Sequence, residues 1–228
     1  AVDGSLKALW IFAEDVVQTD QNTHHVIKAM QGLDLLVVQE IFMSETAKMA
    51  DVVLPGTTFL EKSGTFTNTE RRIQQVNAAV KPLPGTKTDG QIIVEMMRKL
   101  GFEQPDFNAE LVLKEIASVV SFFEGVTWEG LRASPMGLQW PVNKKGEDTQ
   151  ILHIGEFKRG KGKFHYHDWK ESEELTKHKN EYPFILTTSR ELQHYNCATM
   201  TRRTSNVKIL TKDVIMLNPK DARAKDLI

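Results

Sequence analysis

Two polar segments of the chain contain side chains of the types that could bind a phosphorylated ligand with many hydrogen-bonding groups. The first, residues 61–72, reads EKSGTFTNTERR and combines three cations (Lys62, Arg71 and Arg72) with hydroxyls and an amide. Such cations can neutralise a diphosphate. The GxxxxGK[ST] spacing of a P-loop is missing here. The residues alone leave two interpretations open, a phosphate-binding segment or a polar β-hairpin on the surface.

The second segment, residues 187–203, reads TTSRELQHYNCATMTRR and directly follows an apolar run. Its hydroxyls, amides, histidine and three arginines suit an anionic ligand with many hydrogen-bonding groups. Taken singly, His194 is more typical of a structural histidine. Cys197 taken singly is more typical of a small buried residue than of a nucleophile.

Acidic and amide residues also stand where two predicted strands end. Glu14 and Asp15 follow the first strand, and Gln39 and Glu40 follow the second. Ligands of open parallel sheets bind beyond the carboxyl ends of the strands, so these side chains could contact a sugar or a base edge. The plainer interpretation, that they begin solvated loops, is favoured when the residues are taken alone.

Other catalytic and metal-binding patterns are missing. The single cysteine cannot form an internal disulfide or build a zinc or iron–sulfur site by itself. The sequence has no GxSxG elbow and no HExxH motif. The pairs His24-His25 and His165/His167 lack a third ligand. We therefore expect no catalytic residue and no metal ligand in this chain.

The composition is that of an ordinary globular protein. Of the 228 residues, 40% are apolar and 26% charged, and the net charge is −1, unlike a nucleic-acid binder. The apolar runs are strand-sized, so we expect no membrane insertion. No secretory signal is visible, which favours the cytoplasm and leaves the periplasm open. Because the chain lacks an initiator Met and ends in AKDLI, we expect a fragment.

The first hundred residues alternate strand and helix patterns. Residues 8–12, 33–39 and 51–54 are predicted strands. Residues 22–31, 44–49 and 89–100 are predicted helices. The last of these begins with an acidic residue, has Arg98 and Lys99 at its end, and is followed by Gly101. Strands and helices that alternate with short links indicate a parallel α/β sheet.

The character of the sequence changes after Gly101. Residues 109–123 are predicted to form one helix, and residues 151–154, 163–166, 181–187 and 214–217 are predicted strands. We predict three parts: an α/β dinucleotide-binding domain over residues 1–135, an irregular linker over 136–180, and the truncated start of a β-rich domain over 181–228.

Four segments together resemble the molybdopterin oxidoreductase family, most closely its formate dehydrogenase branch. They are AEDVVQTD (13–20), LLVVQEIFMSETAKMADVVLP (35–55), FLEKSGTFTNTERRIQ (59–74) and SRELQHYNCATMTRR (189–203). Their order and spacing also match, and the resemblance covers the chain from about Leu6 to its end. The pair ADVVLP and EKxGTFTNTERR is highly specific, and the RExxHY form favours formate dehydrogenases over nitrate reductases.

The resemblance implies an α/β dinucleotide-binding domain followed by the start of a β-rich, double-psi-barrel-like domain. It implies an enzyme that oxidises formate to CO2, or the reverse, with Mo or W held by two molybdopterin guanine dinucleotides. It also implies a 4Fe-4S cluster outside this chain and iron–sulfur or other electron-transfer subunits as partners. The family's metal ligand and its reacting His and Arg have no counterpart here, so the chain alone is not expected to turn over formate.

Cofactor contacts carry over residue by residue. Gln39 and Glu40 match the end of a guanosine-binding strand, Lys62 a basic cofactor contact, and Asp89 a carboxylate near the guanine. A carboxylate can accept both N1–H and N2–H of guanine. The segment that wraps a pterin dinucleotide supplies the rest of the predicted site. Glu14, at the end of the first predicted strand, is a further predicted cofactor contact. The contacts predicted in the wrapping segment are Thr188, Ser189, Arg190, Glu191, His194, Tyr195, Asn196 and Cys197.

Two alternatives stay open at this point. One is another oxidoreductase of the family, such as an assimilatory nitrate reductase. The other is a non-catalytic scaffold, as in the large iron–sulfur subunit of respiratory complex I. The retained EKxGTFTNTERR and RExxHY segments speak against a scaffold, which would have no use for a set of pterin contacts.

Overall fold

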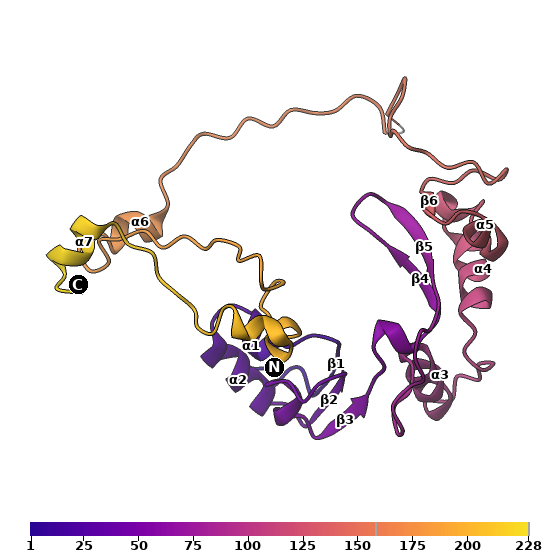
Figure 1. Ribbon diagram of the computed structural model, residues 1–228, viewed down its shortest axis with the longest axis horizontal. Coiled ribbons are helices and arrows are strands. Elements are labelled where there is room, and N and C mark those ends of the chain that lie inside the picture. The colour runs from indigo at the N-terminus through magenta and orange to yellow at the C-terminus, as the bar shows by residue number, and fades with distance from the viewer. Residues whose placement is uncertain (158, 228) are drawn as a thin grey trace. The chain divides into compact units, whose positions relative to one another are not determined.

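Residues 1–157 and 159–227 are described by a computed structural model, in which the chain forms two separate compact units. The first unit runs from Ala1 to Tyr166 and the second begins at His167. Figure 1 follows the chain from the strands of the first unit to the short helices of the second. Each unit is described by itself.

A three-stranded parallel sheet opens the first unit. Its strands are β1 (Ala8–Phe12), β2 (Leu35–Glu40) and β3 (Val52–Pro55), in the order β1-β2-β3. Trp10 pairs with Val37, and Gln39 pairs with Leu54. The carboxyl ends of the three strands therefore meet at one edge. The parallel α/β sheet predicted from the alternating pattern is confirmed.

One face of this sheet is covered by the helices that connect the strands. Ile11, Leu36 and Val38 point to that face and are buried against residues that include Val16 and Met30. These two come from α1 (Val16–Thr19) and α2 (Thr23–Gln31), which Figure 1 shows beside the strands. A short 3-10 turn, η1 (Ala47–Met49), leads into β3. The predicted helix over 22–31 is thus confirmed, and the side chain of Asn22 caps it by accepting from the amide of His25.

A second sheet is antiparallel. The 3-10 turn η2 (Phe59–Glu61) leads into β4 (Gly64–Thr67), which pairs with β5 (Arg72–Val76), and β5 pairs with β6 (Leu138–Gln139). Residues 61–72 therefore include a β-hairpin, as one of the two open interpretations predicted. Its turn is closed by Asn68, whose side chain accepts from the amides of Glu70 and Arg72.

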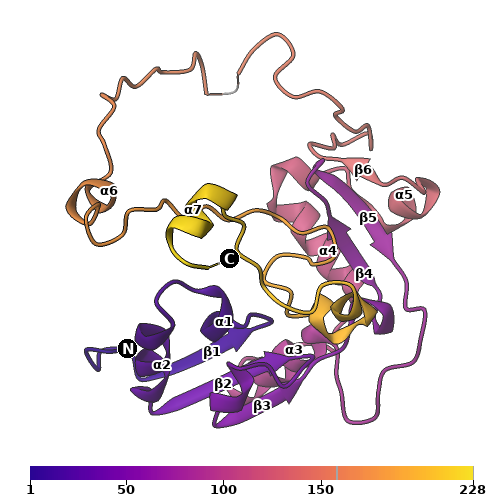
Figure 2. The same ribbon diagram turned by 60° about the vertical axis from the view of Figure 1, so that its left-hand side comes forward.

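Helices pack beside this hairpin. They are α3 (Asp89–Lys99), α4 (Ala109–Val119), the 3-10 turn η3 (Ser121–Phe123) and α5 (Trp128–Ala133). Ile73, Leu113 and Leu131 are buried in one cluster that joins β5, α4 and α5. Figure 2 shows α4 beside β4 and β5.

The prediction of one helix over residues 109–123 is wrong. The helix ends at Val119, because Val120 has extended backbone angles (φ −106°, ψ 106°). This break turns Phe122 toward Trp140, with 5.5 Å between ring centroids, and lets Phe123 pack on the core. Aromatic packing therefore overrides the continuous helical pattern.

The second unit contains short helical elements. They are α6 (Glu173–Lys177), η4 (Thr201–Arg203), η5 (Ser205–Lys208) and α7 (Pro219–Ala224). Among the described residues, the strands predicted at 151–154 and 163–166 in the first unit and at 181–187 and 214–217 in the second unit are not formed. A strand needs a neighbour for its ladder of hydrogen bonds, and no described residue supplies one to these segments. The β-rich, double-psi-barrel-like domain stays a prediction.

Candidate functional site

The candidate site is built around Asp89, the first residue of α3. The helix begins here because Thr88 forms a capping box with Gln91: each side chain accepts from the backbone amide of the other residue. A carboxylate in the first turn lies at the positive end of the helix dipole. The local sequence therefore places the carboxylate of Asp89 at the start of α3.

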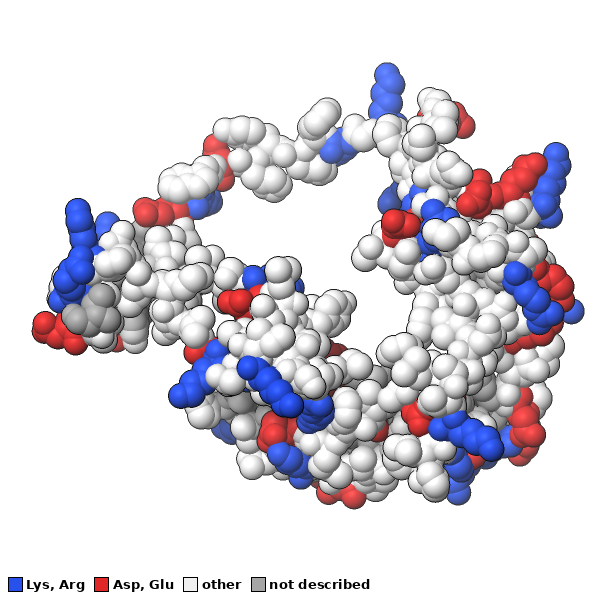
Figure 3. Space-filling view, in the orientation of Figure 1, with Lys and Arg blue, Asp and Glu red and all other residues white. Residues whose placement is uncertain are grey.

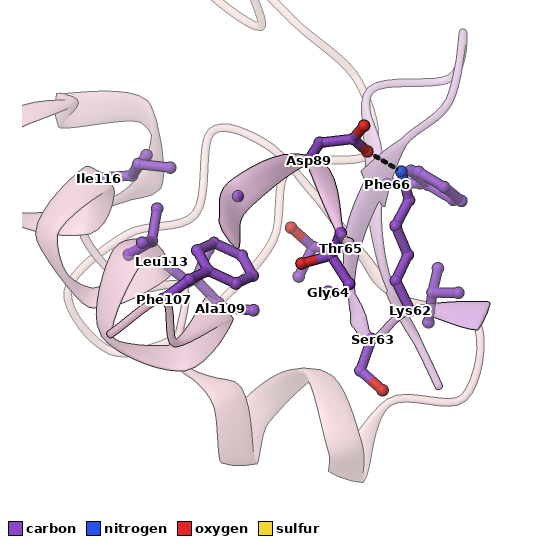
Figure 4. A pocket seen from close by; sticks show the side chains of 14 residues that line it. Lys62, Ser63, Gly64, Thr65, Phe66, Asp89, Phe107, Ala109, Leu113 and Ile116 are labelled. Atoms are coloured by element: carbon purple, nitrogen blue, oxygen red, sulfur yellow. Dashed lines mark hydrogen bonds and ion pairs between the residues drawn. The ribbon is translucent and has the colours of Figure 1, made fainter. Parts of the chain in front are cut away.

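Two side chains from other elements reach the Asp89 carboxylate. Gln39, near the end of β2, donates from Nε2 to Oδ1 at 3.0 Å. Lys62, directly after η2, forms an ion pair with Oδ2. Figure 4 draws this ion pair as a dashed line. We call Gln39, Lys62 and Asp89 the strand-end triad. Three residues that lie far apart in the sequence, each predicted as a cofactor contact, are thus brought together.

The triad is partly shielded from solvent and has one spare acceptor. The Lys62 and Asp89 side chains are 27% and 24% exposed, and Gln39 is 1% exposed. Among the described residues, Oε1 of Gln39 is buried and has no hydrogen-bond partner. Buried polar atoms are normally satisfied, so a spare acceptor at this place needs a partner from outside the described residues.

The cavity beside the triad has a volume of about 270 Å³. Its polar end is formed by Lys62 and Asp89, and Figure 4 shows Phe107, Leu113 and Ile116 on its other side. Phe107 lies so close to α3 that a Cβ atom on Gly90 would be 2.2 Å from its ring. The remaining lining residues are Ser63, Gly64, Thr65, Phe66, Val76, Thr88, Ala109 and Val112.

Glu40 and Glu14 are the other residues predicted as cofactor contacts at the strand ends. Glu40 is 9% exposed, and its carboxylate accepts from the amide of Ile41 at 2.7 Å. Glu14 is exposed and lies in the loop after β1. The residue before it, Ala13, donates its amide to the carbonyl of Gln39 at 2.9 Å. The carboxylate of Glu40 thus has a structural partner, whereas Glu14 faces solvent.

Sequence reasoning missed a buried tie between the two strand-end loops. The Asp15 carboxylate is 4% exposed and accepts from the amide (3.0 Å) and the hydroxyl (2.7 Å) of Thr46. The same hydroxyl oxygen accepts from the amide of Val17 at 3.1 Å. The sequence alone leaves Asp15 as a possible ligand contact or, in the favoured interpretation, the start of a solvated loop. The structure instead makes it the residue that joins the loop after β1 to the loop after β2.

Arg71 and Arg72, predicted as possible diphosphate contacts, have other partners. Arg71 has a left-handed backbone (φ 64°) and donates to the carbonyls of Trp140, Thr149 and Gln150. Its guanidinium also lies over the Trp140 ring, 5.6 Å from the centroid. Arg72 pairs with Glu70. In this structure Arg71 therefore holds residues 140–150 against the hairpin.

Sequence reasoning also missed Glu61, which lies beside Lys62. Its carboxylate is 8% exposed and accepts from the amide and hydroxyl of Thr58 and from the amide of Leu83. The backbone N–H of Thr58, with the other donors, lowers the pKa of Glu61 from its ordinary value. An S/T-x-x-E capping-box pattern at Thr58–Glu61 was the available signal.

The predicted contacts of the second unit lie in one loop, residues 188–210. Arg190 donates to the side chain of Asn196 at 3.3 Å. His194 lies with Nδ1 3.0 Å from the Thr201 hydroxyl and Nε2 3.3 Å from the Leu210 carbonyl. Cys197 contacts the Thr199 hydroxyl at 3.1 Å.

The other predicted contacts of this loop present their side chains to solvent. Tyr195 is 74% exposed, and Asn196, the partner of Arg190, is also exposed. Thr188, Ser189 and Glu191 are exposed. The loop thus combines side chains that hold it together with side chains that are open to a ligand.

Three further observations concern surface charge, metal binding and membrane-spanning helices. Figure 3 shows acidic and basic side chains interspersed over the face in view. Within residues 1–157 and 159–227, no group of three or more His, Cys, Asp or Glu side chains is placed to hold a metal ion. In the same residues, we find no helix with the length and apolar character needed to cross a membrane.

Comparisons with known proteins agree on one family. The family described as molybdopterin oxidoreductase matches residues 1–99. The F420-dependent formate dehydrogenase subunit alpha of Methanocaldococcus jannaschii is 41% identical over 96% of this chain and 33% of its own length. A putative formate dehydrogenase of Staphylococcus aureus is 37% identical over 90% of this chain and 21% of its own. The chain therefore spans a third or less of these relatives.

A solved structure supports the fold. The acetylene hydratase from Pelobacter acetylenicus matches with a TM-score of 0.68 over 97% of this chain and 32% of its own. Its sequence identity is 22%, so the likeness concerns the fold alone.

Proposed function

Because the chain belongs to the molybdopterin oxidoreductase family, we propose that its strand-end triad binds the guanine of a molybdopterin guanine dinucleotide. The family implies a molybdopterin cofactor with Mo or W. We further propose that the chain is the cofactor-binding segment of a longer formate dehydrogenase catalytic subunit. The similarity to relatives named as formate dehydrogenases supports this substrate.

The observation that carries the proposal is the spare acceptor in a triad whose donors and acceptors fit guanine. The two oxygens of Asp89 have more lone pairs than Gln39 and Lys62 use, so the carboxylate can still accept N1–H and N2–H of the base. Oε1 of Gln39 is a buried acceptor that a bound nucleoside would satisfy. Lys62 supplies a positive charge for the phosphates of the same ligand.

The loop 188–210 supplies the second proposed set of contacts. Arg190 can pair with a phosphate or with carbonyl groups of the pterin. The exposed side chains of Tyr195 and Asn196 add hydroxyl and amide groups. Glu14 and Glu40 at the strand ends, and Thr188, Ser189, Glu191, His194 and Cys197 in the loop, complete the proposed contacts.

The bound cofactor would supply the two-electron oxidation of formate to CO2. The residues of this chain bind and orient it: Asp89 and Gln39 hold the base, and Lys62 offsets negative charge. We propose two guanine dinucleotides per subunit, a 4Fe-4S cluster outside this chain, and a partner subunit that accepts the electrons. Relatives named as alpha subunits support the last point.

The guanine role is tested with Asp89→Ala in the intact subunit. Loss of a charged, two-point hydrogen bond should weaken nucleotide binding at least about tenfold. Guanine nucleotide released by acid, counted per subunit, should fall by about half, since one of two dinucleotides loses its base contact. The matched control is Asp106→Ala, because Asp106 is also an aspartate in an ion pair, with Arg98, but is 96% exposed. Full retention of guanine nucleotide in Asp89→Ala would contradict the proposal.

The substrate is tested separately. The intact subunit should reduce a dye with formate as electron donor. Turnover of nitrate with no turnover of formate would contradict the substrate and leave the guanine site intact.

A further inference from the structure

Four consecutive residues, Leu60 to Ser63, divide their contacts between two parts of the first unit. The carbonyl of Leu60 accepts from the amides of Ala79 (2.8 Å) and Val80 (3.1 Å). Three of the four residues bind the loop that follows β5, residues 77–83. The fourth residue, Lys62, instead forms an ion pair through its side chain with Asp89 on α3.

The other two loop contacts come from the neighbours of Lys62 on both sides. Glu61 accepts from the amide of Leu83 at 2.9 Å through Oε1. The hydroxyl of Ser63 accepts from the amide of Ala78 at 3.0 Å. The backbone on either side of Lys62 is therefore tied to the same loop, and we call these contacts the Lys62 bracket.

Glu61 is the central member of the bracket. It is a buried carboxylate that accepts hydrogen bonds from Thr58 and Leu83, and no cation of the described residues 1–157 and 159–227 pairs with it. Acidic side chains are rarely buried without being paired, because desolvation of the charge is costly. Its two oxygens join different elements: Oε2 closes the η2 turn, and Oε1 holds the 77–83 loop. The lowered pKa of Glu61 agrees with a carboxylate that stays ionised in these contacts.

We infer that Glu61 is a positioning residue for Lys62, holding the backbone from which the lysine ammonium reaches Asp89. The inference rests on the proposed function, in which Lys62 and Asp89 belong to the guanine site. A lysine has a long, flexible stem and loses entropy when its end is held in one place. Fixing the backbone at both neighbours restricts the positions that the ammonium can sample. The bracket therefore favours the ion pair without contacting the ligand.

The test uses Glu61→Gln in the intact subunit, purified without cofactor. Glutamine keeps the size of the side chain but has one acceptor oxygen and one NH2 group, so it cannot accept from Thr58 and Leu83 together. The reactivity of each lysine toward acetic anhydride is measured by mass spectrometry. Lys48 and Lys99 serve as internal references, and Glu103→Gln, at an exposed glutamate, is the matched control.

We expect Glu61→Gln to raise the acetylation rate of Lys62 about tenfold, the factor for losing one hydrogen bond to a charged group. The rates of Lys48 and Lys99 should not change. Ser63→Ala, which removes one contact of the bracket and leaves Glu61 in place, should raise the Lys62 rate by a smaller factor. An unchanged Lys62 rate in both folded variants would overturn the inference.

Global unfolding gives a different pattern, since it raises the rates of all three lysines together. If Glu61→Gln raises all three rates, the result for Ser63→Ala is used instead. In that variant, a higher acetylation rate at Lys62 alone supports the inference, and an unchanged Lys62 rate overturns it. Failure of the guanine proposal is distinguishable, because it is read from nucleotide content in Asp89→Ala. Lysine acetylation reports the position of Lys62 whether or not a nucleotide binds.

Discussion

The strand-end triad and the 188–210 loop contain similar polar side chains, but the two are held in different ways. The triad residues come from or directly follow β2, η2 and α3, and are between 1% and 27% exposed. The 188–210 loop contains two short 3-10 turns, and several of its proposed contacts are exposed. Sites on regular elements hold their geometry more closely than sites on loops.

This difference shows which interactions fix each site. The triad depends on the packing that brings α3 to the end of β2, and on the capping box that starts α3 at Thr88. The loop depends on individual side-chain contacts, such as those of His194. A change in packing should therefore affect the triad most, and the loss of one polar contact should affect the loop locally.

The largest effect is expected from Gly90→Ala. The new Cβ would be 2.2–2.5 Å from three atoms of the Phe107 ring, so the ring must leave its place beside α3. Overpacking of this kind costs about 3 kcal/mol, which exceeds the gain of up to about 1 kcal/mol from replacing Gly by Ala in a helix. Thermal unfolding of the purified chain should show the lower stability.

Gly64→Ala is the matched control for this prediction. Gly64 lines the same cavity from β4, and a Cβ added there meets no atom within 4 Å. Equal melting temperatures for the two variants would show that the Phe107 ring can move with little loss of stability. The triad would then not depend on the packing of Phe107 against α3.

A smaller effect is expected from Thr46→Val, which removes a hydroxyl and keeps the shape. The hydroxyl donates to the buried Asp15 carboxylate and accepts from the amide of Val17. Loss of a hydrogen bond to a charged group costs about 2 kcal/mol. Chemical denaturation should show this loss, and Thr46→Ser, which keeps the hydroxyl, should recover most of it. If Thr46→Val is as stable as the unchanged protein, the tie between the strand-end loops does not depend on these hydrogen bonds.

The sheet and the position of Asp89 could be predicted from the sequence for a clear reason. Val38 and its apolar neighbours form a run of strand length, and the pattern DGQIIVEMMRKL has helical periodicity with charges that suit its ends. Alternation of such elements indicates a parallel sheet, whose strand ends then coincide at one edge. Local patterns thus contain the architecture of the parallel sheet.

The sequence did not reveal which polar residues serve structure and which are open to a ligand. Arg71 reads as a phosphate contact, but its guanidinium binds the carbonyl of Thr149, 78 positions later in the chain. Asp15 reads as a loop residue, but it is buried against Thr46. The strands expected near Phe184 and Ile215 depend on partners that local patterns cannot supply. Long-range contacts decide these cases.

The smallest effect is expected from His194→Ala, and it should be confined to the loop. The Leu210 carbonyl can only accept, so Nε2 of His194 is assigned the proton, and Nδ1 then accepts from the Thr201 hydroxyl. The oxygen of that hydroxyl also accepts from the amide of Tyr195 at 3.3 Å. Loss of these neutral contacts costs about 1 kcal/mol, so hydrogen exchange of amides in 195–210 should quicken by about fivefold.

Thr201→Val separates a structural role of His194 from a direct contact with the cofactor. It removes the hydroxyl that His194 and Tyr195 share but leaves the imidazole in place. If both variants quicken exchange and lower cofactor content alike, His194 acts by holding the loop. If only His194→Ala loses cofactor, the imidazole contacts the ligand itself. His167→Ala, at an exposed histidine of the same unit, is the control. Exchange that quickens in the strands of the first unit would contradict the local effect from which the comparison starts.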